Sequence, residues 1–378
     1  MNTDFILQIV TAILCFLSVL FAVFLLFVES ENKIGNRILS IFLMVRALDA
    51  SVLIYGNYVA LHPVLDIVRH DVGGFFQSPL LFLFVLSVLY RDFRLGFKYL
   101  WLLVPFLLST LVLIPRYYLA YLGFENTLFD GLPLGFEMTF SYSLFVIQNL
   151  GLVLLTFFIL NRYKSILSEN YANTDNSNYD WLFQLNMISL VLFIAALIKN
   201  IHKFQDNPWL ITELRILVMC ISLVFICWLV FKALLVPKLF RGIDSNLQLV
   251  LAEDAVKMFE ETEESRRTLA KIEKLQAYMV EKEPYLNPDL TVAKLANELD
   301  VNVTDLSLLI NHHLSKNFHT FINHYRIKKA ETLLKEPTKK YTIQEILYQV
   351  GFNSKSSFNG SFKKQTGLTP TQYRDKYK

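Results

Sequence analysis

Seven long apolar runs dominate the first part of the chain. They span roughly residues 5–28, 38–60, 73–90, 99–120, 139–161, 181–198 and 212–235. A helix needs about 20 mainly apolar residues to cross a bilayer. Lipid offers backbone groups no hydrogen-bond partner, so each segment must satisfy its own groups as a helix. The pattern therefore predicts an all-α fold whose residues 1–240 form a seven-helix transmembrane domain.

Basic residues in the connecting loops predict the orientation of this domain. With the N-terminus outside, nine lie in inner loops, namely Lys33, Arg37, Arg91, Arg94, Lys98, Arg162, Lys164, Lys238 and Arg241. Only four lie in outer loops, namely Arg69, Arg116, Lys199 and Lys203. Because loops rich in Lys and Arg stay on the cytoplasmic side, we expect an outside N-terminus and a cytoplasmic C-terminal region.

Two charged residues interrupt the second apolar run. Arg46 and Asp49 are three residues apart, so they share one helix face and can partly neutralise each other. Charges in a spanning helix are costly and usually face a bundle interior or a water-filled cavity. The pair is a candidate sensing site, as part of a ligand site or a switch between helix packings. A purely structural pair that holds the bundle together is the alternative.

Composition narrows the classes of function. Hydrophobic residues make up 54% of the chain and charged residues 18%, with a mean hydropathy of +0.39, which excludes a disordered chain or a small disulfide scaffold. Cys15, Cys220 and Cys227 lie in apolar runs and are expected to be small buried hydrophobes. No phosphate-binding loop or catalytic motif occurs in the sequence, so no enzyme activity and no cofactor are expected.

A polar connector follows at residues 241–285. Apolar and small residues recur there three and four apart, the spacing of a coiled-coil seam, although the middle of the seam is polar. The helix is expected to end near Pro284 and Pro288. Two interpretations remain open. The helix either pairs with its counterpart in a second copy of the chain or packs on the domain that follows.

The C-terminal region, residues 286–378, is basic and contains two similar helix pairs. Residues 290–378 hold 14 Lys and Arg against 7 Asp and Glu. The spacing predicts one helix–turn–helix arrangement over 291–314 and a second over 341–364, joined by a longer helix over 318–335. Gly351 suits a left-handed turn position, and Phe352, Phe358 and Phe362 are expected to fill the second core. Such a domain could present two recognition helices to adjacent major-groove turns of DNA.

Two stretches carry a specific resemblance. FINHYRIKKAETLL at 321–334 and GFNSKSSFNGSFKKQTGLTPTQYR at 351–374 resemble the DNA-binding domain of AraC/XylS-type transcription regulators. The resemblance covers about 275–378 and implies a membrane-tethered regulator in the inner (cytoplasmic) membrane of a bacterium. It implies double-stranded DNA and RNA polymerase as partners. The apolar runs add the lipid bilayer as a partner, and the spacing in the connector adds a second copy of the chain in a homodimer.

The resemblance also implies which residues contact DNA. In the first recognition helix, about 303–313, the outward residues are expected to be Thr304, Asp305, Ser307, Leu308, Asn311 and His312. In the second, about 354–364, base edges or phosphates are within reach of Ser354, Lys355, Ser356, Ser357 and Asn359. Lys363 and Lys364 are expected to touch backbone phosphate. Arg326, Lys328 and Lys329 could also bind phosphate or form a solvated helix face.

Three functions remain open from the sequence. The first is a membrane-embedded one-component transcription regulator that senses a signal through its bundle. The second is a membrane receptor whose helical tail docks a protein partner, motivated by Leu308 and Gly360 where relatives often have Arg. The third is a transporter or intramembrane enzyme with a regulatory tail. The sequence does not indicate the ligand, and the four histidines at 312, 313, 319 and 324 form no metal-binding pattern.

Overall fold

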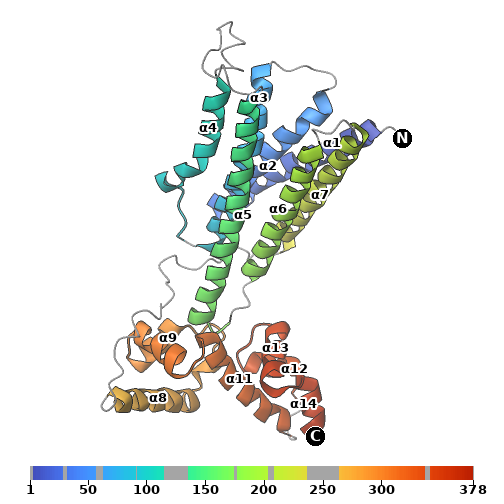
Figure 1. The fold of residues 1–378 in the computed structure, drawn as a ribbon. Coiled ribbons are helices and arrows are strands. Elements are labelled where there is room, and N and C mark those ends of the chain that lie inside the picture. Colours follow the sequence, from blue (N-terminus) through green and yellow to red (C-terminus); the bar gives the residue numbers. More distant parts are fainter. Residues whose placement is uncertain are drawn as a thin grey trace. The chain divides into compact units, whose positions relative to one another are not determined.

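The computed structural model describes residues 3–28, 32–56, 63–90, 92–114, 135–173, 177–202, 208–235, 264–336 and 341–377. Within these ranges the chain is helical and contains no strand, as the sequence predicts (Figure 1). The chain divides into two compact units. Unit 1 comprises Met1–Leu160 and Asn178–Ser245, and unit 2 comprises Asn161–Ser177 and Asn246–Lys378.

Long apolar helices build unit 1. Their bounds are α1 Thr3–Phe27, α2 Lys33–Tyr55, α3 Pro63–Leu89, η1 Phe97–Leu103, α4 Val104–Leu113, α5 Phe136–Asn170, α6 Ser177–His202 and α7 Pro208–Leu235. The end of α5 from Asn161 and the first residue of α6 belong to unit 2. Six helices of the described ranges are long and apolar enough to cross a membrane. The fourth of the seven predicted spans differs. Its described part contains a shorter apolar stretch, Phe97–Leu113, which begins as a 3-10 helix, and residues 115–120 lie outside the described residues.

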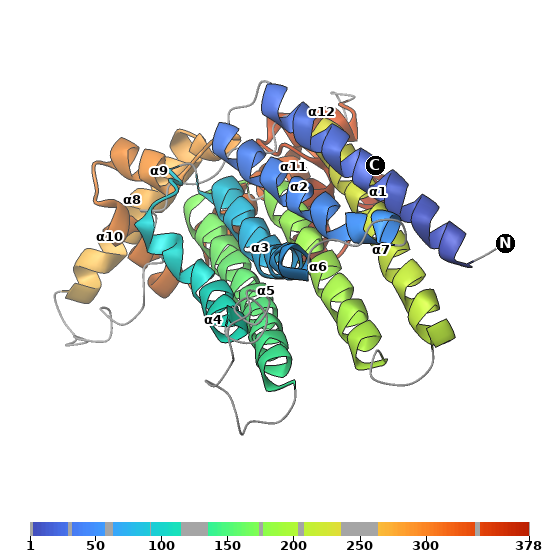
Figure 2. The same ribbon diagram turned by 90° about the horizontal axis from the view of Figure 1, so that it is seen from above.

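Packing in unit 1 leaves large apolar side chains of several long helices exposed. Helix α1 packs against α2 and α7, and α2 packs against α3. Figure 2 shows α6 and α7 running side by side. On α1, Leu14 is fully buried, whereas Phe16 and Phe27 are 65% and 82% exposed. An apolar surface of this extent suits hydrocarbon rather than water, because large contiguous apolar patches are rare on water-soluble monomers.

A chain of polar side chains crosses the inside of unit 1. Arg46 on α2 donates to Oε1 of Gln77 on α3 at 2.8 Å and to the hydroxyl of Ser222 on α7. Nε2 of Gln77 donates in turn to Asp49 at 3.2 Å, and Arg69 approaches the same carboxylate at 3.6 Å. Gln77 therefore connects Arg46 to Asp49, a mediator that the sequence pattern did not indicate. The chain of contacts joins three helices.

The cysteines correct one expectation. All three are free, Cys15 is half-buried, and Cys220 and Cys227 are exposed on the surface of unit 1. The prediction of buried cysteines is therefore wrong for α7. The reason is the rotation of this helix, whose buried face carries Val218, Ser222, Phe225, Ile226 and Leu229 instead.

Short helices build the C-terminal part of unit 2. Their bounds are α8 Glu264–Glu281, η5 Pro284–Leu286, α9 Val292–Leu299, α10 Val303–Leu308, η6 Leu309–His313, α11 Phe318–Lys335, α12 Ile343–Gln349, α13 Lys355–Thr366 and α14 Pro370–Tyr377. Segment η6 continues α10 as a π-helix. The predicted helix pairs and the helix between them are confirmed, with α11 beginning at Phe318 and ending at Lys335.

Helix α11 supports two separate hydrophobic cores, one at each end. Figure 1 shows α11 between α9 and the group formed by α12, α13 and α14. Its first half contributes Phe318, Phe321 and Ile322 to the core of the first helix pair. Its second half contributes Ile327 and Ala330 to the core of the second pair. The predicted aromatic plug of the second core, Phe352, Phe358 and Phe362, is buried to 1% exposure or less. One continuous helix thus holds both pairs.

Each of the two tight turns contains one residue with a positive φ angle, and the two residues differ. Asp300 ends α9 in the left-handed region at φ 56°, and Gly351 follows α12 at φ 90°, as the sequence predicts for this glycine. A Cβ at Gly351 would stand 2.7 Å from the carbonyl oxygen of Tyr285 and 2.8 Å from that of Leu286. Glycine is required there by the close approach of this backbone as well as by the dihedral angle.

The described end of the connector packs on the following domain. In α8, Leu275 and Met279 are buried in the core of the first helix pair. The helix ends at Glu281, three residues before Pro284, as predicted. The first part of the proposed seam, residues 251–262, lies outside the described residues. Within its described length, α8 thus follows the second of the two interpretations.

Candidate nucleic-acid interface

The first recognition helix is α10 with its continuation η6. Asn302 caps it, because its Oδ1 accepts from the backbone N–H of Thr304 at 2.8 Å. Leu306, Leu309 and Ile310 anchor the helix in the core. Thr304, Asp305 and His312 are exposed, and Leu308 and Asn311 are partly so. These side chains form the outward face of the first recognition helix.

Ser307 does not belong to that face. Its exposure is 5%, and its hydroxyl accepts from Nδ2 of Asn311 at 3.4 Å. The expectation that Ser307 points outward is wrong because it follows Leu306 on the side of the helix that enters the core. Asp305 is exposed, but it also lines a groove of about 270 Å3 beside Lys271 and Lys274 of α8. Its carboxylate in the first turn of α10 is better suited to stabilising the helix N-terminus than to meeting phosphate.

The second recognition helix is α13. Ser354 caps it, accepting from the backbone N–H of Ser357 at 3.2 Å. Phe358 and Phe362 fix the inner face in the core. The outer face comprises exposed Lys355, Ser356, Lys363 and Lys364, with Ser354, Ser357 and Asn359 partly exposed. Hydroxyl, amide and ammonium groups of this kind can contact base edges and phosphates. These side chains therefore remain the predicted DNA contacts of the second helix pair.

The basic residues of α11 separate into different environments. Lys328 is exposed. Lys329 forms a 2.6 Å ion pair with Glu283. Arg326 is fully buried. Its side chain donates to the carbonyl oxygens of Tyr285 at 2.7 Å and Asn287 at 2.9 Å. The expectation that Arg326 binds phosphate or lies on a solvated face is therefore wrong.

Local environments shift several pKa values in this unit. Lys329, which hydrogen-bonds Glu283, holds the pKa of that carboxyl below its usual range. Burial, reinforced by the hydrogen bond to Glu283, raises the pKa of Tyr285. Burial and the nearby cations Lys316 and Lys328 lower the pKa of His324, so its ring is neutral at physiological pH. Neutral His324 is consistent with a structural position on α11.

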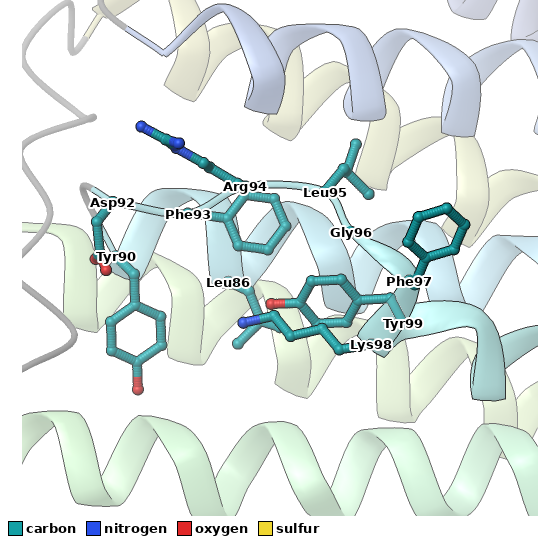
Figure 3. A pocket seen from close by; sticks show the side chains of 10 residues that line it. All are labelled: Leu86, Tyr90, Asp92, Phe93, Arg94, Leu95, Gly96, Phe97, Lys98 and Tyr99. Carbon is teal, nitrogen blue, oxygen red and sulfur yellow. The ribbon is translucent and has the colours of Figure 1, made fainter.

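An open cavity of about 580 Å3 follows α3 in unit 1 (Figure 3). Its lining combines aromatic residues with two cations, Arg94 and Lys98. Nζ of Lys98 stands 5.1 Å from the centre of the Tyr99 ring. Amphipathic side chains of this type are common where a membrane protein meets the headgroup region. In the part of the chain that the structure describes, no cluster of His, Cys, Asp and Glu could hold a metal ion.

Comparison with known families classifies the C-terminal region. The family described as "Helix-turn-helix domain" matches residues 295–376. These residues form a helix-turn-helix domain of the AraC type, which confirms the resemblance carried by the sequence.

Individual relatives match parts of the chain. The chain is 33% identical to "Histidine kinase P4" of Formosa agariphila over 102 residues, 27% of this chain and 7% of the relative. It is 39% identical over 56 residues to "HTH-type transcriptional regulator MtrA" of Neisseria gonorrhoeae, 15% of this chain and 18% of the relative. An uncharacterised HTH-type transcriptional regulator of Staphylococcus aureus is 35% identical over 92 residues, 24% of this chain and 12% of the relative. The chain thus spans less than a fifth of each of these relatives.

A solved structure also matches part of the chain. It is the C-terminal domain of AraT, a response regulator from Geobacillus stearothermophilus, with 30% identity. The match covers 28% of this chain and 82% of that chain, with a TM-score of 0.24.

Proposed function

We propose that the protein is a membrane-embedded one-component transcription regulator that binds promoter DNA through two helix-turn-helix units. One observation carries the proposal. The described residues of this chain contain two capped recognition helices with exposed polar faces and six apolar helices long enough to span a membrane. The names of the relatives, which include HTH-type transcriptional regulators, support the regulatory role. The domain division at residues 1–240, 241–285 and 286–378 is part of the proposal.

The proposed setting is the inner membrane of a bacterium, with the N-terminus outside and the DNA-binding domain in the cytoplasm. The distribution of basic residues in the loops supports this orientation. A homodimer would supply further recognition helices. Tethering two DNA-binding domains in one complex raises the effective concentration of the second one at the promoter. RNA polymerase is the proposed partner at the promoter.

Chromatin occupancy of the intact protein in living cells tests function and orientation together, because a domain outside the cell never meets the chromosome. Lys355→Ala, which removes an exposed cation at the start of α13, is expected to reduce occupancy of the strongest sites by about tenfold. Lys376→Ala is the matched control. It removes the same charge from exposed α14 and should leave those sites occupied.

Equal losses for both lysine variants would indicate non-specific electrostatic binding. No site-specific occupancy by the wild-type protein would reject promoter binding, and it would favour a tail that docks a protein partner.

We further propose that the polar chain in unit 1 is part of the sensing mechanism. Asp49→Asn keeps the size of the side chain but removes the charge that Arg69 approaches, and Asp49 is linked through Gln77 to Arg46. Because these contacts join three helices, the variant is expected to change transcription next to the strongest occupied site by about threefold or more, without loss of occupancy. Transcript measurement in matched cultures provides the readout.

The control for this variant uses the other partner of the same arginine. Asp66 pairs with Arg69 at 2.8 Å within α3 and is half-exposed. Asp66→Asn removes an equal charge beside the same arginine, from α3 instead of α2, and should leave transcription unchanged. If Asp49→Asn also leaves transcription unchanged, the chain of contacts has a structural role only and carries no signal.

A further inference from the structure

A short segment between α5 and α6 belongs to the same compact unit as the helix-turn-helix domain. Tyr171 follows the end of α5 directly, and residues 161–177 belong to unit 2. Tyr171 forms an isolated antiparallel bridge with Thr291, the N-cap of α9. The backbone N–H of Ala172 donates to the carbonyl oxygen of Leu290 at 3.1 Å. Ala172 is fully buried in the core of the first helix pair. We name Tyr171–Asn173 the docking segment.

The amide of Asn173 reaches both helix pairs. Its Nδ2 donates to the carbonyl oxygen of Pro288 at 2.6 Å, just before the first pair. The same Nδ2 lies 3.2 Å from the carbonyl oxygen of Gly351, in the turn of the second pair. Its Oδ1 accepts from Arg326 at 2.8 Å. One side chain from outside the helix-turn-helix sequence thus connects the two halves of the domain with the helix between them.

Arg326 occupies the joint between the halves. It lies on α11 between the residues that enter the first core and those that enter the second. Its guanidinium stands 5.5 Å from the centre of the Phe352 ring in the second core. It donates to the backbone of Tyr285 and Asn287 on the first side. Because a buried charge is stable only while its hydrogen bonds are made, loss of the acceptor on Asn173 would disturb this joint.

We propose that the docking segment is a regulatory contact that sets the placement of the two recognition helices relative to each other. The segment that covers Arg326 is thus the α5–α6 connection of the same chain. Covalent continuity with α5 makes this connection a direct route by which a change in the apolar helices reaches the DNA-binding domain, independent of the connector at 241–285. The regulatory meaning rests on the proposed DNA-binding function, whereas the docking itself does not.

Distance measurements on the full chain in lipid nanodiscs test the placement without DNA. The three native cysteines are replaced by alanine, and spin labels are attached at Thr304→Cys and Lys355→Cys, exposed positions at the start of the two recognition helices. Asn173→Ala is expected to broaden or shift the distance distribution. Asn173→Asp keeps an acceptor for Arg326 but loses both donated bonds, so a smaller change is expected.

Asn297→Ala is the matched control, because Asn297 is exposed on α9. It should reproduce the wild-type distance distribution. Identical distributions for wild type and Asn173→Ala would overturn the proposal.

Disulfide trapping tests the docking in the otherwise unaltered joint. Residues facing each other in an antiparallel bridge are close enough for a disulfide. In the same cysteine-free background, the pair Tyr171→Cys and Thr291→Cys is therefore expected to cross-link efficiently under mild oxidation. A protease site inserted at residue 250 leaves the two fragments joined only where the bond has formed. A yield no higher than that of a control pair, Tyr171→Cys with Thr371→Cys on α14, would overturn the docking.

Measurements of DNA affinity then test whether the docking segment regulates DNA binding or has a structural role only. On the strongest occupied sequence, Asn173→Ala is expected to lower the affinity of the nanodisc protein about tenfold, because a looser joint reduces the effective concentration of the second unit. Affinity for a DNA that carries half of the sequence should not change. Equal affinities of wild type and variant on the full sequence would overturn the regulatory role. Absence of specific DNA binding by the wild type would reject the proposed function, while the distance and cross-linking results still decide the docking.

Discussion

Gly351→Ala is expected to destabilise the second helix pair by about 2–5 kcal/mol. A left-handed dihedral angle costs an ordinary residue roughly 1–2 kcal/mol, and overpacking adds about 1–3 kcal/mol. Both apply here, since φ is 90° and the new Cβ would stand 2.7 Å from the carbonyl oxygen of Tyr285. Hydrogen–deuterium exchange of peptides from α12 and α13 in the full chain should show protection reduced by about two orders of magnitude.

Two further variants identify the cause of that loss. At Gly360, on exposed α13, an added Cβ meets nothing within 4 Å, so Gly360→Ala should stabilise the helix by up to about 1 kcal/mol. Gly351→Asn introduces a residue that tolerates the left-handed region but carries the same Cβ. If it destabilises as much as alanine does, the close approach to Tyr285 is the main cause. Unchanged protection in Gly351→Ala would show that the turn is not held as described.

Phe358→Ala is expected to cost the second helix pair about 3–5 kcal/mol. Phe358 is fully buried, and its ring centre lies 5.3 Å from that of Phe352 and 5.7 Å from that of Phe362. Truncation removes the middle of this aromatic row and leaves a cavity that a small domain cannot refill. The same exchange measurement should show α13 exchanging far faster, and promoter occupancy should fall with it.

Tyr348→Ala provides the control for this truncation. Tyr348 is 58% exposed on α12, so its loss should change protection little. Similar effects of the two aromatic truncations would contradict the assignment of Phe358 to the core.

The DNA-binding domain was predictable because its information is local. Apolar residues three and four apart determine which side of each short helix is buried, and Asn302, Ser354 and Thr342 mark the helix starts by capping them. The long apolar helices were predictable for a different reason, since a bilayer requires length and hydropathy rather than a particular partner. The fourth span is the exception. Its described part is shorter and begins as a 3-10 helix at Phe97.

The contacts that the sequence did not indicate are polar and distant along the chain. Arg326 and Asn173 are separated by 153 positions, and no periodicity links an arginine in a basic helix to an amide in a polar connection. Gln77 was missed for the same reason, because an amide in an apolar helix shows no pattern until its partners are known. Ser307 shows the converse error. A polar residue on a recognition helix was expected outside, although it lies on the buried side.

The wide turn at the end of the first recognition helix affects comparison with other proteins. In η6 the backbone N–H of Leu314 reaches the carbonyl oxygen of Leu309, five residues back instead of four. This winding places more residues in each turn, so side chains beyond Leu309 are rotated relative to those of an ordinary helix. If His312 and His313 are aligned with another regulator by counting positions, the alignment therefore gives their side chains the wrong direction around the helix axis. Rules that relate helix positions to DNA bases in regular helices must therefore be shifted for the residues after Leu309.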